Sequence, residues 1–116
     1  MKIETIFIDE LDKEFTFYIG ENKNDNFNVI DNANDNDLWF HANNISSCHV
    51  VALIPERFDK KYLKYIIKWG ALLCKTRTSK LKDLNDVEIM YTYLSNVTKT
   101  KTPGLVNVKN KKTIII

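Results

Sequence analysis

A chain of 116 residues that is 44% hydrophobic and 28% charged has the size and composition of one soluble globular domain, and we expect residues 1–116 to form it. Its apolar runs are shorter than the roughly 18 residues that span a membrane, and its first residues lack a signal-peptide pattern, which predicts a cytoplasmic protein without membrane attachment. The net charge of +2 is divided unevenly: residues 1–37 hold three Lys against ten acids (−7), and residues 38–116 hold fourteen Lys and Arg against five acids (+9). Such a separation can steer a polyanion to one side of a molecule.

The first third of the chain predicts a β-hairpin and then a polar segment. Ile3–Ile8 and Phe15–Ile19 have the composition of strands on either side of an acidic turn, and Gly20 ends the second strand. Residues 21–37 are rich in Asn and Asp. Within them a short second helix is possible over 24–33, with Phe27, Val29 and Ile30 as its apolar anchors.

Two further strands and the main helix follow. Leu38–Ala42 and Cys48–Ile54 are rich in β-favouring residues, and Pro55 stops the second strand. Asp59 suits a helix N-cap, and about eighteen residues with helical periodicity come after it. Gly70 lies at the centre of the predicted apolar face, which indicates a helix packed closely on a sheet; the face is completed by Tyr62, Leu63, Ile66, Ile67, Leu73 and Cys74.

The last third predicts three more strands. Val87–Tyr93 is one, and Leu105–Val108 and Thr113–Ile116 are expected to form a hairpin across residues 109–112. Between them lies a basic, hydroxyl-rich loop over 96–102, followed by a Pro-Gly turn. The predicted fold class is therefore α+β: a largely antiparallel sheet of about six to seven strands, with one main helix on a face and a possible short second helix.

Basic residues in the second half of the chain are the first candidate site. Five lysines within residues 99–112, a segment without acids, alternate in part with threonines, and both residue types bind phosphate oxygens. The end of the main helix adds further positive charge. The candidate phosphate contacts are Lys75, Arg77, Lys99, Lys101, Lys109, Lys111 and Lys112; the alternative is a set of solvated lysines with no ligand.

Two histidines and an aromatic pair are the second candidate. His41 and His49 occupy related places on predicted neighbouring strands, where their imidazoles could meet. Trp39 and Phe40 point to opposite faces of one strand, so we expect one in the core and at most one as a stacking platform for bases. Either histidine is equally suited to hydrogen-bond the turn between the strands.

A catalytic or metal centre is not expected. Cys48 and His49 are neighbours in a strand and so face opposite ways, and no nucleophile-elbow pattern accompanies them. Cys48 and Cys74 form no C-x-x-C pair, and in a chain without a secretion signal we expect them to stay reduced. The sequence therefore predicts no enzyme activity, no metal and no cofactor.

Several short motifs follow one another in a familiar order. Asn-Asp-Leu-Trp-Phe-His at 36–41 leads through a turn into Cys-His-Val at 48–50. A Gly-Glu-Asn-Lys segment at 20–23 precedes them, and the basic helix end at 75–79 and the Asn-Val and Pro-Gly segments within 96–106 follow. In this order and spacing the chain resembles the nucleic-acid-binding R domain of the NFACT family. Its Ser-Ser before Cys-His, where the family often has Pro-Gly, is similar to the eukaryotic stand-alone group that contains a coiled coil.

The resemblance implies a non-enzymatic nucleic-acid-binding module, foremost for RNA such as tRNA or ribosomal RNA in ribosome-associated quality control. It places His41 and His49 at motif positions that would fix the turn or touch a phosphate, and they join Trp39, the candidate stacking platform, among the nucleic-acid-binding residues. A DNA-binding module is one alternative. Another is a module that docks on the ribosome or on a ribosome-associated factor through the acidic first third of the chain.

Overall fold

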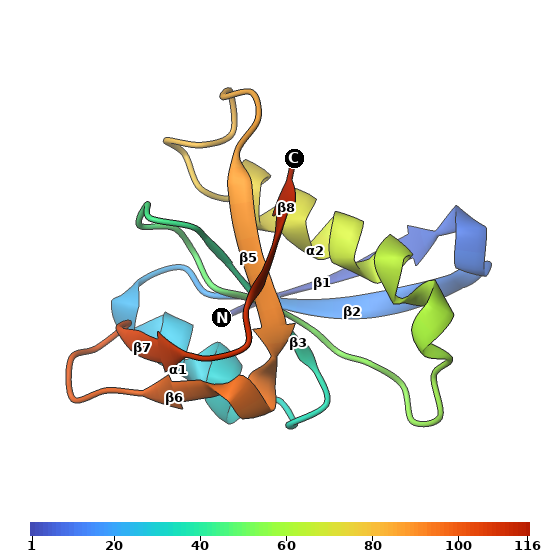
Figure 1. Cartoon of the computed structure of the whole chain (residues 1–116), viewed down its shortest axis with the longest axis horizontal. Coiled ribbons are helices and arrows are strands. Elements are labelled where there is room, and N and C mark those ends of the chain that lie inside the picture. The colour runs from blue at the N-terminus through green and yellow to red at the C-terminus, as the bar shows by residue number, and fades with distance from the viewer.

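A six-stranded antiparallel sheet forms the centre of the protein (Figure 1); the computed structural model describes all of residues 1–116. Its spatial order is β1-β2-β4-β3-β5-β8. Strand β4 therefore lies between β2 and β3, and β8 pairs with the earlier strand β5. The strands are β1 (Lys2–Ile8), β2 (Lys13–Ile19), β3 (Leu38–Ala42), β4 (Val50–Ala52), β5 (Glu88–Tyr93) and β8 (Lys112–Ile115). This architecture confirms the predicted α+β class and the predicted β1–β2 hairpin.

Two unlike layers cover the faces of this sheet. Helix α2 (Leu63–Thr76) packs on one face, over Phe40 and its neighbours. The other face is covered by helix α1 (Lys23–Asp31) and by a second, two-stranded sheet of β6 (Val97–Lys99) and β7 (Val106–Val108). In Figure 1, α1, β6 and β7 lie together away from α2.

The second layer explains why Trp39 and Phe40 are both buried. The two side chains point to opposite faces, as predicted, but each face has a cover: Phe40 lies in the cluster under α2, and Trp39 lies with Val29 of α1 and Val51 of β4. At most one of the two rings was expected to serve as a stacking platform, and the second layer leaves neither ring exposed. Trp39 is 0% exposed and is not available as a stacking platform.

Helix α2 approaches the sheet closely at Gly70, as predicted. A Cβ at this position would lie 2.3 Å from the ring of Phe40, so no larger residue fits without displacing the ring. The side chain of Asp59 accepts a hydrogen bond from Lys61 N at 3.1 Å, but it caps a 3-10 turn (Lys60–Tyr62) that leads into α2. Tyr62, predicted to be on the buried face, is 40% exposed because it belongs to that turn.

The predicted hairpin of the last two strands is wrong. β7 pairs with β6 in the small sheet, whereas β8 pairs with β5 in the large one. The chain changes sheet at Lys109 and Asn110, where Asn110 has a left-handed backbone (φ 54°) and both carbonyls accept from the Thr92 hydroxyl. The basic segment predicted as a loop therefore contains a strand and anchors a second layer. No helix has the length and apolar character required to span a membrane.

Candidate nucleic-acid interface

The turn between β3 and β4 is tied to both layers of the protein. The Ser47 hydroxyl accepts from the backbone N–H of Ala42 at 2.9 Å, and the backbone N–H of Cys48 donates to the Thr78 hydroxyl at 3.1 Å. The next N–H, of His49, donates to Oδ1 of Asn26 in α1 at 3.1 Å. The turn's own Ser47 and two side chains distant in sequence, Thr78 and Asn26, thus hold this turn in one conformation.

Gly20 is required by the same arrangement. Its backbone N–H donates to the carbonyl of His49 at 2.9 Å, and a Cβ on Gly20 would lie 2.1 Å from Oδ1 of Asn26. The Asn26 amide therefore reaches the turn only because residue 20 has no side chain. Asn22 begins α1 by accepting from Asp25 N at 2.9 Å.

The imidazoles of His41 and His49 do meet, with ring centroids 4.9 Å apart at 86°. Trp39 joins them: its Nε1–H donates to Nδ1 of His49 at 3.2 Å, and its ring stacks on that of His41 with centroids 5.8 Å apart. Burial, reinforced by neighbouring His41 and opposed by a hydrogen bond to the Gly104 backbone, lowers the pKa of His49 to about 3. Burial also lowers the pKa of His41, which is half-buried.

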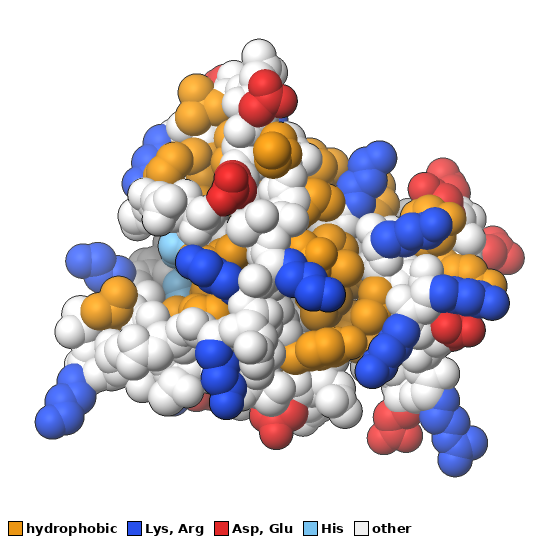
Figure 2. Space-filling model, viewed as in Figure 1, with side chains coloured by type: hydrophobic (Ala, Val, Ile, Leu, Met, Phe, Trp, Pro, Cys, Tyr) orange, Lys and Arg blue, Asp and Glu red, His pale blue; other side chains and the backbone are white.

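Two adjoining cavities of about 540 and 320 Å³ run along this turn, and we call them together the motif groove. The larger is lined by residues 19–23, 46–48 and 77–80, and the smaller by His41, His49 and residues 102–105; both share Lys23, Asn26, Ser46 and Ser47. In Figure 1 the green loop after β3, α1 and the β6–β7 turn gather on one side, and Figure 2 shows pale-blue histidine atoms set back on that side.

The motif groove is basic and rich in polar groups. Lys2, Lys23, Arg77 and Lys80 line it, against Glu21 as the one acid. Arg77 forms a two-pronged pair with Glu4, at 3.1 Å (Nε to Oε2) and 2.7 Å (Nη2 to Oε1), whereas Lys23 and Lys80 have no carboxylate within 4.0 Å. The hydroxyls of Ser46 and Ser79 add hydrogen-bonding groups, whereas those of Ser47 and Thr78 are already hydrogen-bonded within the protein. Such a surface matches the oxygens of phosphates.

The other predicted phosphate contacts lie elsewhere. Lys75 approaches the carbonyl of Ile116 at 3.4 Å, and Lys111 approaches Oδ1 of Asn43 at 3.5 Å. Lys99 pairs with Asp31 of α1 and stands over the ring of Phe27, 5.5 Å from its centroid. Lys101, Lys109 and Lys112 are exposed and unpaired, and Lys112 lines a different cleft beside α2. Of the predicted set, only Arg77, His41 and His49 line the motif groove.

Some groove residues were not selected from the sequence. Lys23 had a signal, because it ends the Gly-Glu-Asn-Lys segment at 20–23, and Lys80 follows the basic end of α2. Lys2 had none, since only the pairing of β1 with β2 brings it to the groove, opposite Ile19. Ser46 and Ser47 precede Cys-His in the turn motif, but nothing in the sequence distinguishes their hydroxyls from those of other serines.

Both cysteines are free; Cys48 lines the motif groove, and Cys74 is buried. Sγ of Cys48 is 3.6 Å from the Cys74 carbonyl, Sγ of Cys74 is 3.5 Å from the Cys48 carbonyl, and the Thr78 hydroxyl donates to Sγ of Cys48 at 3.3 Å. A hydrogen bond with the Cys74 thiol, opposed by burial and assisted by Thr78, lowers the pKa of Cys48 to about 7. The hydrogen bond with Cys48, together with burial, raises the pKa of Cys74. No group of three or more His, Cys, Asp or Glu side chains is placed to hold a metal ion.

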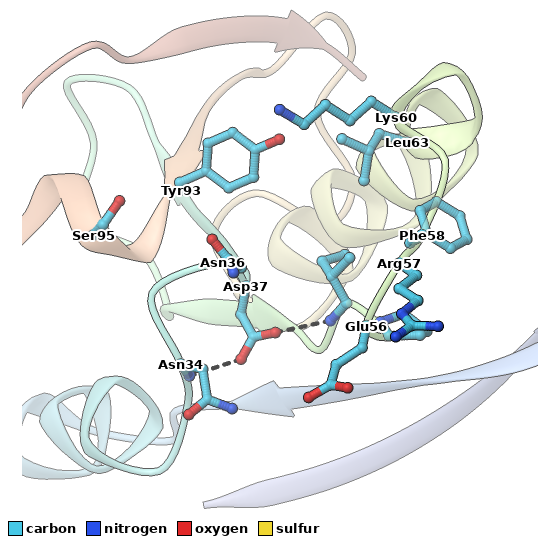
Figure 3. A pocket seen from close by; sticks show the side chains of 12 residues that line it. Asn34, Asn36, Asp37, Glu56, Arg57, Phe58, Lys60, Leu63, Tyr93 and Ser95 are labelled. Carbon is cyan, nitrogen blue, oxygen red and sulfur yellow. Dashed lines mark hydrogen bonds between the residues drawn. The ribbon is translucent and has the colours of Figure 1, made fainter.

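A third cavity, of about 580 Å³, opens beside Asp37 (Figure 3). The Asp37 carboxylate accepts from the backbone N–H groups of Asn34 and Ile54, each at 2.8 Å. The backbone carbonyl of Asp37 accepts from the N–H of Leu94, also at 2.8 Å. Asp37 is 3% exposed, so this acid of the Asn-Asp motif joins three chain segments and does not face a ligand.

Comparison with known proteins gives consistent matches. A family model described as the NFACT protein RNA binding domain matches residues 5–110. Coiled-coil domain-containing protein 25 from Mus musculus and from Bos taurus are each 30% identical to the chain over 87 residues, which is 74% of this chain and 42% of those proteins. The chain therefore spans about two fifths of the length of these curated relatives.

Among solved structures, the C-terminal part of the fibronectin/fibrinogen-binding protein from Streptococcus suis has the same fold. It matches with a TM-score of 0.80 at 23% identity, over 100% of this chain and 45% of that one. The sequence likeness is too low to carry more than the architecture.

Proposed function

The chain belongs to the NFACT RNA-binding domain family, and on this basis we propose that it binds RNA, without catalysis, through the phosphate backbone in the motif groove. One observation carries the proposal. Segments 20–23, 46–50, 75–79 and 96–106, which hold the family-like motifs, lie far apart in the chain and supply residues to one continuous groove.

The chemistry of the groove supports a polyanionic ligand. Lys23 and Lys80 are cations without acidic partners, and the Ser46–Ser47 turn between them is held fixed from three sides. Hydrogen-bonding groups on a turn that is already held in one conformation lose little entropy when a phosphate binds. Each phosphate that a lysine neutralises also releases counterions. His49 stays neutral and buried at physiological pH, so its part is to shape the groove and not to add charge.

Structured RNA, either tRNA or ribosomal RNA, is the proposed ligand, in a cytoplasmic ribosome quality-control setting. Lysines outside the motif groove extend the contact along such a large ligand; these are Lys75, Lys99, Lys101, Lys109, Lys111 and Lys112. Of these, Lys101, Lys109 and Lys112 are the best placed, because all three are exposed and unpaired. Lys99 would first have to leave Asp31.

Fluorescence anisotropy with labelled tRNA at two salt concentrations tests the proposal, with single-stranded RNA and duplex DNA of matched length as competitors. We expect affinity to fall steeply with salt, because phosphate contacts release counterions, and tRNA to compete best. Preference for duplex DNA would reassign the ligand. No binding to any nucleic acid at low salt would refute the proposal and favour docking to a protein.

A further inference from the structure

A cleft of about 490 Å³ separates the start of α2 from strands β5 and β8, at the far end of α2 from Arg77. A 14-residue helix is roughly 21 Å long, so this cleft is distinct from the motif groove. Figure 2 shows it as an orange hollow between β8 and the first turns of α2, with blue side chains on both sides.

Two tyrosines form the β5 wall of the cleft. Tyr91 and Tyr93 are two residues apart and so share one face of the strand. Tyr91 is held from behind by Phe40, with ring centroids 6.2 Å apart, and its partner across the strands is Lys112. Tyr93 has no partner from β8, because the pairing of β5 with β8 stops at Tyr91, and Leu63 and Ile67 lie on the α2 side.

Lysines surround these rings, and no acid lines the cleft. Lys60 and Lys64 stand on the α2 side and Lys112 on the β8 side, and none of the three has a carboxylate within 4.0 Å. Figure 3 shows Lys60 extending from the turn that leads into α2 toward the ring of Tyr93. Unpaired cations around half-buried aromatic rings favour a ligand that is both flat and anionic.

We propose that this cleft binds an unpaired nucleobase of the RNA, stacked on Tyr93 and Tyr91, with its flanking phosphates on Lys112, Lys60 and Lys64. The inference rests on the proposed function and adds to it a preference for RNA with a single-stranded segment. Aromatic rings stack on any base, and lysines at the rim bind the backbone on either side. The volume lies within the ~300–1,000 Å³ typical of small-ligand sites, which is enough for one nucleotide.

The test uses a short single-stranded RNA that contains the fluorescent base 2-aminopurine, with a fully paired duplex RNA of the same length. Stacking quenches the probe, so we expect quenching with the wild-type chain and none with Tyr93→Leu. Tyr93→Leu should weaken single-strand binding roughly 5- to 100-fold, whereas Tyr93→Phe, which keeps the ring, should stay within about twofold. Binding of the duplex should change in neither variant.

Lys112→Gln keeps the test valid if Tyr93→Leu fails to fold, because Lys112 is an exposed residue. It should reduce the salt dependence of the RNA affinity by an amount that corresponds to about one phosphate contact. If Tyr93→Leu and Lys112→Gln both bind single-stranded RNA as the wild type does, the cleft inference is wrong while RNA binding stands. Equal loss in Tyr93→Phe and Tyr93→Leu would also refute stacking. If the wild-type chain binds no RNA, the proposed function itself fails.

Discussion

The indole Nε1–H of Trp39 donates to Nδ1 of His49 across 3.2 Å, and this bond determines which imidazole nitrogen carries the proton. Because Nδ1 must accept, His49 is neutral with its proton on Nε2. A second proton would remove the acceptor and leave the buried indole N–H without a partner. The fold therefore depends on the neutral form of one histidine that is 1% exposed.

Mild acid should destabilise the protein through His49. Its pKa is about 3 in the folded chain and about 6.5 when unfolded, so the unfolded state binds more protons between these values. The stabilisation is complete above pH 6.5 and is lost progressively as pH falls, with a slope of up to about 1.4 kcal/mol per pH unit. Urea unfolding at pH 7, 6 and 5 measures it.

His49→Gln provides the comparison for that experiment. The variant should be less stable at pH 7, since the Trp39 bond and the packing against His41 are altered, but its stability should change less between pH 7 and 5. An identical slope in both proteins would show that His49 is not the titrating group.

Gly70→Ala should destabilise the protein, although the same change in an exposed helix is stabilising by about 1 kcal/mol. The new methyl group would meet the ring of Phe40 at 2.3 Å, and overpacking of this kind costs about 1–3 kcal/mol. The double variant Gly70→Ala, Phe40→Leu should recover part of the loss, which a double-mutant cycle of urea unfolding detects. Simple additivity would contradict the contact.

Asp37→Asn should cost about 1–3 kcal/mol of stability. The carboxylate accepts from two backbone N–H groups, whereas an amide offers one oxygen and turns an NH₂ group toward the other donor. Asp35→Asn is the matched control, because Asp35 is exposed and its carboxylate has no hydrogen-bond partner. Thermal unfolding compares the two variants, and equal melting temperatures would show that the hydrogen bonds of the Asp37 carboxylate do not stabilise the fold.

Cys48 should react with iodoacetamide before Cys74. Its pKa of about 7 makes much of the thiol a thiolate at pH 7.5, and it lines the motif groove, whereas Cys74 is buried with a raised pKa. Intact-mass analysis with peptide mapping identifies the labelled residue. Bound tRNA should slow the reaction of Cys48, and unchanged labelling under saturating tRNA would place the ligand elsewhere.

Lys23→Glu should weaken tRNA binding without unfolding the protein. Lys23 is the first residue of α1, where a negative charge is favourable to the helix, so the loss is specific to the groove. We expect the slope of log affinity against log salt concentration to become shallower by an amount that corresponds to about one phosphate contact. Lys13→Glu makes the same change in net charge on an exposed residue outside the groove, and it should leave binding within about twofold. Equal effects would indicate a response to net charge alone.

The parts of the fold that the sequence predicted correctly are those with local signals. The hydrophobic period of α2, the close approach at Gly70 and the β1–β2 hairpin are each indicated by residues that are close together in the sequence. The last hairpin was wrong because two apolar runs across a four-residue polar turn resemble paired strands, whereas the true partner of β7 is a strand of only three residues, 97–99.

The site was less predictable because its chemistry depends on long-range partners. Lys99 looks like any other lysine of its segment until the fold places Asp31 beside it, 68 residues away. Lys23 and Lys80 become the free cations of one groove only after α1 and the end of α2 converge on the Ser46–Ser47 turn. The meeting of His41 and His49 was predictable, since alternation along neighbouring strands set it.

Three of the residues that make this sequence recognisable, Asp37, Trp39 and His49, are buried. Asp37 joins three segments, Trp39 is enclosed between layers, and His49 holds the indole, so each is constrained by folding whether or not a ligand ever binds. Lys23, Lys80 and Lys101 are on the surface and can be exchanged at little cost to the scaffold. The motif thus describes the scaffold, and the specificity of this chain should be sought at exposed positions such as Lys23, Lys80 and Lys101.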